Sequence, residues 1–178
     1  MDSTKVVQGE KEIEASLNQI CDHLLKRHPQ LNEMVLVGIR TGGVYLAERL
    51  RKKLLQRKGT DLPTGIIDIT LYRDDLNSPH GSGQPRVRTT EIGFDIDDKV
   101  IILVDDVLYT GRSTRAAMDA LIDLGRPKAI RLAVLVERAG RELPIQADYA
   151  GCAADVDPQR SVQVNLVESD GKDEVIVE

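Results

Sequence analysis

Two adjacent aspartates, Asp105 and Asp106, follow an apolar run and lead directly into a turn rich in hydroxyl groups and glycine, in VIILVDDVLYTGRST (residues 100–114). Neighbouring side chains project in different directions, so the two carboxylates suit the two hydroxyls of a ribose better than one shared metal ion. The turn offers hydroxyls and the unpaired N–H groups that begin a helix, an arrangement that binds phosphate. Together these features predict a site for a ribose 5-phosphate.

Two other interpretations of the pair need weighing. Asp105 and Asp106 would also fit a solvated start of a loop, with Ser113 as an ordinary helix cap. Phosphoreceiver domains likewise end a strand in paired aspartates, but theirs follow the first strand, whereas this pair follows a later one and adjoins a phosphate-type turn. The apolar strand before the pair and the anion-binding turn after it favour the ribose phosphate interpretation.

The chain pattern predicts an α/β fold that would place this motif at the edge of a sheet. Apolar runs typical of buried strands lie at 33–39, 64–72, 99–104 and 129–137, and helical patterns lie at 11–29, 44–59 and 114–125. Alternation of this kind indicates a parallel sheet covered on both faces, with ligands bound beyond the carboxyl ends of its strands. Two further short strands are expected at 162–167 and 174–178.

Composition limits the classes of function. The 178 residues include no apolar run long enough to cross a membrane, so we expect a cytoplasmic protein without membrane contact. A net charge of −5 and 3% aromatic residues argue against a protein that binds nucleic acid mainly through a positive field or a stacking platform. Two distant cysteines exclude a disulfide framework or zinc site, and Cys21 is expected in the core.

The motif resembles the signature of type I phosphoribosyltransferases, which bind phosphoribosyl pyrophosphate (PRPP). Together with LVGIRTGGVYLAERL, IDITLYRDDL, ALIDLGRP, LAVLVER and RELPIQADYAG, it is similar in order and spacing to the PyrR family over residues 10–150. That family attenuates pyrimidine operons and contains uracil phosphoribosyltransferases. The resemblance implies a type I phosphoribosyltransferase fold, with a mostly parallel twisted sheet, helices on both faces and a small hood. It also implies one domain over residues 1–178, with a flexible loop at about 72–94.

The same resemblance implies which residues bind PRPP. Asp105 and Asp106 would hold the ribose hydroxyls, and the turn after them the 5-phosphate. Arg40 to Gly43 would form the pyrophosphate loop, where glycine lets backbone N–H groups face the anion, although RTGG alone also fits an ordinary strand-to-helix turn. The implied nucleotide-binding set is Arg40, Thr41, Gly42, Gly43, Asp105, Asp106, Val107, Leu108, Tyr109, Thr110, Gly111, Arg112, Ser113 and Thr114.

Further arginines extend the implied site. The 72–94 loop would close over PRPP and exclude water, with Arg73 catalytic beside Asp105, Asp106 and Arg40. Arg86 and Arg88 would reach pyrophosphate from the same loop, whose other interpretation is a disordered surface segment. Arg138 and Arg141 would contact phosphate or RNA, or hold surface carboxylates. Mg²⁺ would arrive with PRPP, because no dedicated set of protein ligands is evident.

The resemblance implies an enzyme that converts uracil and PRPP to UMP and pyrophosphate and that also regulates pyrimidine genes. Tyr109 stands where purine enzymes have an aspartate, which agrees with uracil as the base. The alternative is a non-catalytic or weakly catalytic sensor of uridine nucleotides that controls the same genes. The family forms dimers and larger rings, so we expect a homo-oligomer.

Two segments depart from the family pattern. The first helix has Glu14, Ala15, Asn18, Gln19 and Asp22 where attenuating relatives have Arg, Arg, Thr, Arg and His. Gly140, Gln146 and Cys152 similarly replace His, Arg and Lys. Loss of cations and gain of acids removes phosphate neutralisation, so we expect weak or absent binding to an RNA hairpin. Residues 151–162 also differ from the sequence that, in the family, forms the segment whose backbone contacts uracil.

Overall fold

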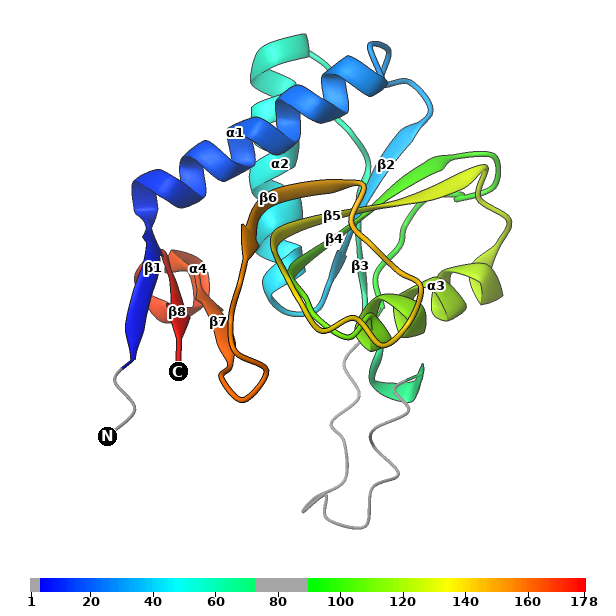
Figure 1. Ribbon diagram of the computed structural model, residues 1–178. Helices are drawn as coiled ribbons and strands as arrows, with labels where there is room; N and C mark the ends of the chain where they lie inside the picture. Colours follow the sequence, from blue (N-terminus) through cyan, green and yellow to red (C-terminus); the bar gives the residue numbers. More distant parts are fainter. Residues whose placement is uncertain (1–3, 73–89) are drawn as a thin grey trace.

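The computed structural model describes residues 4–72 and 90–178 and is built around a parallel sheet (Figure 1). Its five strands lie in the order β3-β2-β4-β5-β6, all parallel. Their bounds are Thr64–Ile67 for β3, Met34–Ile39 for β2, Val100–Leu108 for β4, Ala129–Arg138 for β5 and Tyr149–Ala154 for β6. The centre of this sheet is fully buried, because helices cover both faces, as the unbroken apolar runs predicted.

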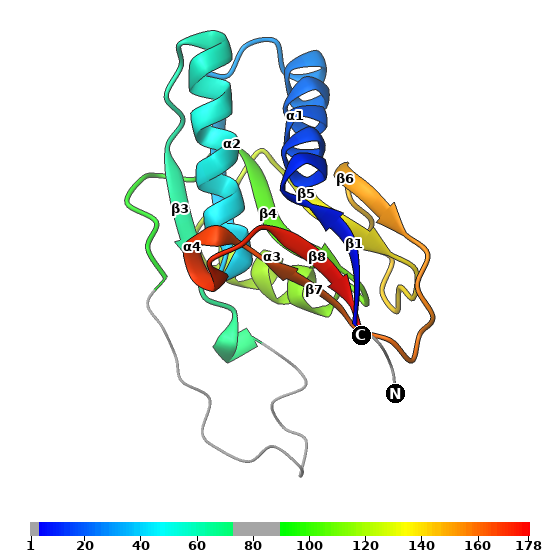
Figure 2. The ribbon, with the colours of Figure 1, turned by 90° about the vertical axis from the view of Figure 1, so that its left-hand side faces the viewer.

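Three long helices cover the sheet. Helices α1 (Glu10–Arg27) and α2 (Gly42–Lys58) pack on one face, and α3 (Arg112–Leu124) packs on the other (Figure 2). In α1 the buried apolar residues recur at helical spacing and include Ile13, Leu17, Ile20, Cys21 and Leu24. Cys21 is therefore the small core residue that the sequence predicted. Among the described residues, no helix is long and apolar enough to cross a bilayer.

The central strand β4 is longer than expected. The sequence predicted that the strand ends at Val104, but β4 continues through both aspartates to Leu108. The extension has a partner: Asp105 is opposite Val134 and Leu108 is opposite Glu137 in the parallel ladder with β5. Both carboxylates therefore belong to a paired strand and are held by its backbone, rather than lying in a loop.

The strand expected over 64–72 is shorter than predicted. Strand β3 ends at Ile67, and a 3-10 turn, η1 (Thr70–Tyr72), follows. The Asp68 carboxylate accepts hydrogen bonds from the N–H and the hydroxyl of Thr70, at 2.9 and 2.6 Å. A local side-chain bond of this kind competes with ladder pairing and turns the chain away from the sheet.

A second, antiparallel sheet is formed by the two ends of the described chain. It has the order β1-β8-β7, with β1 at Lys5–Gly9, β7 at Val162–Asn165 and β8 at Glu174–Val177. A short helix, α4 (Val167–Asp170), connects β7 to β8 and lies near α2 in both views. The sequence predicted β7 and β8 but missed β1 and β6.

An arginine of α2 fastens this small sheet to the main body. The Arg49 guanidinium donates to the carboxylates of Glu168 and Asp173 over 2.5 to 2.8 Å. Apolar contacts add to this clamp, because Leu166 and Val175 belong to the same buried cluster as the inner faces of α1 and α2. The small sheet therefore packs against α1 and α2 beside the parallel sheet, at the left of Figure 1.

Most of the loop expected over 72–94 lies outside the described residues. At its start, the Tyr72 hydroxyl donates to Asp123 of α3 at 2.8 Å. At its end, Glu91 forms an isolated antiparallel bridge to Ile66, and Phe94 packs against the hydrophobic cluster beneath α3. Both described ends of the segment are thus tied to the body of the protein.

Candidate functional site

The fold brings two of the predicted segments together at the carboxyl edge of the sheet. Strands β2 and β4 are neighbours, so Arg40 to Gly43 lie beside the end of β4. The contact is close: a Cβ on Gly42 would lie 2.7 Å from Asp106 Oδ2, and one on Gly43 would lie 2.1 Å from the Val104 carbonyl oxygen. Glycine is needed at Gly43, because the start of α2 rests directly on the backbone of the strand that carries the aspartates, whereas a Cβ at Gly42 would meet the Asp106 side chain.

The two aspartates occupy different environments. Asp105 is 9% exposed, and burial together with repulsion from the neighbouring Asp106 carboxylate raises its pKa well above the usual range. Its Oδ1 accepts a hydrogen bond from the Asp106 N–H at 2.9 Å, and Asp106 Oδ1 accepts one from the Val107 N–H at 2.7 Å. The backbone therefore orients both carboxyl groups before any ligand binds.

The turn after β4 has the geometry of an anion site. Gly111 adopts φ = 93° and precedes α3, whose first turn contains no acidic residue and whose N-cap position has no side-chain hydrogen bond. The Thr110 carbonyl accepts bonds from the N–H groups of Glu142 and Leu143, at 3.0 and 3.1 Å, which holds the turn against the chain after β5. The start of α3 thus presents N–H groups and a positive helix end toward the site.

Arg40 lies at the opposite side of the aspartates. Its N–H donates to the Ile67 carbonyl at 3.1 Å, and its guanidinium is 3.7 Å from the Glu91 carboxylate. The Arg40–Thr41 peptide is cis. The side chain is 21% exposed, so its charge lies at the edge of the site and within reach of solvent.

Arg138 has a role that the sequence analysis did not anticipate. It is 5% exposed, stacks on the Tyr109 ring with Cζ 3.9 Å from the centroid, and donates to the carbonyls of Arg160 and Asp157 at 2.8 and 3.2 Å. Of the two arginines expected to contact phosphate or RNA, or to hold surface carboxylates, Arg138 is buried and Arg141 is exposed. These contacts join residues far apart in the sequence, so no local pattern signals them.

The Tyr109–Arg138 pair separates two hollows. One, of about 450 Å³, is lined by Val107, Tyr109, Arg138, Pro158, Gln159, Arg160, Ser161 and Val162. The other, of about 420 Å³, contains Arg141, Gln146 and Asp155 on the far side of the pair. Both lie beside the residues expected to bind the sugar, and both include part of the divergent 151–162 segment.

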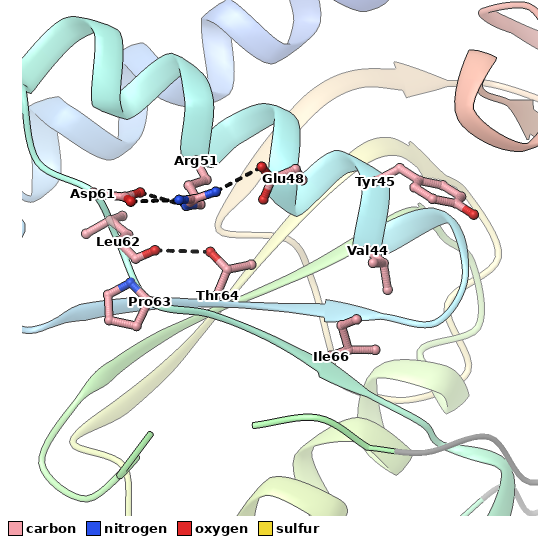
Figure 3. A pocket seen from close by; sticks show the side chains of 9 residues that line it. All are labelled: Val44, Tyr45, Glu48, Arg51, Asp61, Leu62, Pro63, Thr64 and Ile66. Carbon is pink, nitrogen blue, oxygen red and sulfur yellow. Dashed lines mark hydrogen bonds and ion pairs between the residues drawn. The ribbon is translucent and has the colours of Figure 1, made fainter. Parts of the chain in front are cut away.

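A third hollow, between α2 and β3, lies apart from these groups (Figure 3). Its volume is about 650 Å³, and the Arg51 guanidinium, bonded to Glu48 and Asp61, closes one end. Its lining residues are Val44, Tyr45, Glu48, Arg51, Asp61, Leu62, Pro63, Thr64 and Ile66, and no predicted site residue is among them. Volume alone therefore does not identify the site.

Some predicted residues remain unplaced. Arg73, Arg86 and Arg88 lie outside the described residues. The described part of the chain contains no group of three or more His, Cys, Asp or Glu side chains arranged to hold a metal ion. Mg²⁺ commonly takes most of its oxygen ligands from water and from a bound phosphate, with few from the protein. A site without a dedicated set of protein ligands is therefore compatible with Mg²⁺ that arrives with PRPP.

Comparisons with known proteins identify the family. Residues 9–169 match the phosphoribosyl transferase domain family. The bifunctional protein PyrR of Clostridioides difficile is 48% identical over 96% of both chains, and that of Desulfosudis oleivorans is 51% identical over 98% of this chain and 95% of its own. A hypoxanthine phosphoribosyltransferase structure from Trypanosoma cruzi, 19% identical, shares the fold with a TM-score of 0.73 over 97% and 90% of the two chains. The chain belongs to the PyrR family of the type I phosphoribosyltransferases.

Proposed function

We propose that this protein transfers the phosphoribosyl group of PRPP to uracil, giving UMP and pyrophosphate, and that it regulates pyrimidine genes. The observation that carries the proposal is the contact between the Gly42–Gly43 backbone and the Asp105–Asp106 strand, beside the start of α3. A sugar diol, a distal phosphate and a leaving anion can be bound together where these three elements meet. Membership of the PyrR family supports uracil as the acceptor.

Each element has a part in the reaction. The Asp105 and Asp106 carboxylates accept hydrogen bonds from the ribose hydroxyls, and the turn from Tyr109 to Thr114 binds the 5-phosphate. The sugar is then fixed at both ends while the bond from its anomeric carbon to pyrophosphate breaks and the bond to uracil N1 forms. The N–H groups and charge of Arg40 to Gly43 stabilise the negative charge that develops on the leaving pyrophosphate.

The base would lie in the hollow between Val107, Tyr109 and residues 158–162. Tyr109 presents an aromatic ring there and has no carboxylate to receive a proton from a purine nitrogen. Mg²⁺ held through PRPP would neutralise part of the pyrophosphate charge. Arg73, Arg86 and Arg88 are proposed to close over the same pyrophosphate.

The test is a transfer assay with the purified protein, PRPP and Mg²⁺. We expect pyrophosphate release and UMP formation that depend on uracil, with no product from hypoxanthine, and loss of both in the Asp105→Asn/Asp106→Asn variant. Equal pyrophosphate release with and without uracil would contradict the proposal. A product from hypoxanthine but not from uracil would assign the protein to a different base.

A second candidate function is a nucleotide-sensing regulator with little catalysis. The observation in its favour is the charge of the α1 surface, where Glu14 pairs with Lys53 of α2, and Asp22 pairs with Arg57 at 2.5 Å. Cations that are already neutralised within the protein are poorly placed to bind RNA phosphates. UMP binding in calorimetry without measurable transfer, and without RNA binding, would favour this candidate over the enzyme.

The proposal treats residues 1–178 as one phosphoribosyltransferase domain. A single buried cluster supports this, since it includes Leu166 and Val175 from the small sheet region together with residues of α1, α2 and the parallel sheet. We further propose a homo-oligomer in solution, which sedimentation at several protein concentrations would test. A mass equal to one chain at all concentrations would contradict it.

A further inference from the structure

The stack of Arg138 on Tyr109 connects parts of the proposed site that belong to different elements. Tyr109 lies at the start of the turn proposed to bind the 5-phosphate, directly before Thr110. Arg138 ends β5, and its guanidinium donates to the backbone of Asp157 and Arg160, in the segment that lines the proposed base hollow. One side chain thus contacts both the phosphate end and the base end of the site.

The Arg138 side chain is a buried cation. It is 5% exposed, and within the described residues its guanidinium forms no ion pair and its Nε has no hydrogen-bond partner. A buried cation without a carboxylate costs stability, whereas an apolar side chain could fill the same space at lower cost. The retained charge therefore calls for a reason other than packing.

Arginine is chemically suited to this connection. Its planar guanidinium can stack on an aromatic ring with its face while its edge donates in-plane to two carbonyl oxygens. Lysine offers a single point charge and cannot make the stack and both bonds in one geometry. The two carbonyl bonds, at 2.8 and 3.2 Å, place the 157–160 backbone at a defined distance from the Tyr109 ring.

Gly140 confines Tyr109 from another side. Its φ of 120° is a conformation that favours glycine, and a Cβ there would lie 2.3 Å from Cε2 of the Tyr109 ring. The ring is therefore held between a guanidinium and a backbone segment. Even a methyl group at position 140 would push the ring out of its present place.

We propose that Arg138 is a positioning residue that fixes the base-side segment 157–162 relative to the 5-phosphate turn, through Tyr109. This inference rests on the proposed function, because it assigns the two ends of one nucleotide to the two ends of the contact. Its consequence is selective: Arg138 governs affinity for ligands that span both ends and leaves affinity for the sugar phosphate alone nearly unchanged.

The test compares UMP with ribose 5-phosphate in calorimetry on the full chain. Arg138→Gln is expected to weaken UMP binding about 10- to 50-fold and ribose 5-phosphate binding less than about 3-fold, a span typical of losing charged hydrogen bonds. Arg138→Lys should recover little of the UMP affinity. Arg126→Gln, which makes the same charge change at an exposed position after α3, is the matched control and should leave both affinities unchanged.

Gly140→Ala provides an independent variant that leaves Arg138 in place. It should cause the same selective loss of UMP affinity, with a change in the tyrosine near-ultraviolet circular dichroism, and it decides the matter if Arg138→Gln does not fold. An equal loss of affinity for both ligands, or no loss of affinity for UMP, would overturn the inference. It would also be overturned if the wild-type protein bound UMP no more tightly than ribose 5-phosphate. If the protein did not transfer phosphoribosyl to uracil but showed the selective loss of UMP affinity, the proposed function would be wrong and the inference about Arg138 would still hold.

Discussion

The carboxyl edge of the parallel sheet and the outer face of α1 and α2 are held together in different ways. At the edge, the backbone of Gly43 rests on the Val104 carbonyl, and the backbone of Gly42 lies against the Asp106 carboxylate. On the α1–α2 face, the contacts are between side chains near solvent, such as the Asp22–Arg57 pair, whose carboxylate side chain is 68% exposed. A side chain added at Gly43 must displace the main chain, whereas a change on the face need only move a side chain.

This difference accounts for which parts of the chain retain the family pattern. The motif from Val100 to Thr114 keeps it, and most of its strand residues, from Ile101 to Asp105 and Leu108, are buried. On α1, two of the positions that depart from the expected family pattern are the acids Glu14 and Asp22, and α2 supplies Lys53 and Arg57 as their partners. Ligand binding at the edge and polyanion binding on the face can therefore change independently.

The largest expected effect comes from removing both charges at the edge. Asp105→Asn/Asp106→Asn should weaken PRPP and ribose 5-phosphate binding at least about 100-fold, because charged hydrogen bonds to two hydroxyls contribute roughly 1.5–3 kcal/mol each. Calorimetry measures this directly. Asp119→Asn, a single change of the same type at a half-exposed position of α3, is the control and should bind normally. Undiminished binding by the double variant would show that the edge does not hold the sugar.

A second test addresses the backbone contact itself. Gly43→Ala should destabilise the protein by about 3 kcal/mol, because its Cβ would meet a strand carbonyl at 2.1 Å and the overpacked helix would have to shift. Gly93→Ala is the matched control, since a Cβ at Gly93 meets nothing within 4 Å. Urea unfolding compares the two. Similar stability of both variants would mean that the edge tolerates change as readily as the face.

The pH dependence of stability sharpens the view of Asp105. Its pKa is raised on folding, by burial and by repulsion from Asp106, so the folded state binds more protons than the unfolded state above the ordinary aspartate pKa. Stability should therefore fall as the pH rises from that ordinary value through the raised one. Asp105→Asn should remove this fall and stabilise the unliganded protein at neutral pH by about 1 kcal/mol, a size common for single stabilising changes. A wild-type unfolding free energy that is flat over this pH range would contradict the assignment.

The sequence alone predicts the parts of this molecule that depend on local pattern. The buried strands, the three long helices and the Asp105–Asp106 edge follow from apolar runs and from residue types at neighbouring positions. Strand β6 escaped prediction because YAGCAA has only one large apolar residue and owes its pairing to β5. Strand β1 escaped because KVVQG is largely exposed and is paired by the distant β8.

The same limit applies within the site. Asp105 and Asp106 could be predicted from the sequence because the paired carboxylates and the phosphate-type turn are adjacent in the chain. Arg138 contacts Tyr109, Asp157 and Arg160, which lie between 19 and 29 residues away from it in the sequence. No local sequence pattern around Arg138 predicts these contacts. Likewise, the continuation of β4 past Val104 depends on its ladder with β5, which only the folded sheet reveals.

Charge reversal on the face should restore polyanion binding without affecting the edge. Glu14→Arg/Ala15→Arg/Asp22→Arg adds cations on exposed α1 positions and removes the carboxylates that pair with Lys53 and Arg57. We expect RNA hairpin affinity at low salt to rise about tenfold, and the dependence of log K on log salt to steepen by about 2, given roughly 0.7 for each phosphate contacted. Fluorescence anisotropy titrations at several salt concentrations measure both. Tight hairpin binding by the wild-type chain would contradict the comparison.

The smallest expected effect concerns the same ion pairs as elements of stability. Glu14→Gln/Asp22→Asn removes two carboxylates whose side chains are 56% and 68% exposed, and exposed pairs contribute about 0–1 kcal/mol each because solvent screens them. Urea unfolding should therefore show a loss below about 1 kcal/mol, well under that of Gly43→Ala, with ribose 5-phosphate binding unchanged. If the loss instead matched that of Gly43→Ala, the face would be as constrained as the edge, and its acidic residues would have to be explained by folding rather than by a change in what the surface binds.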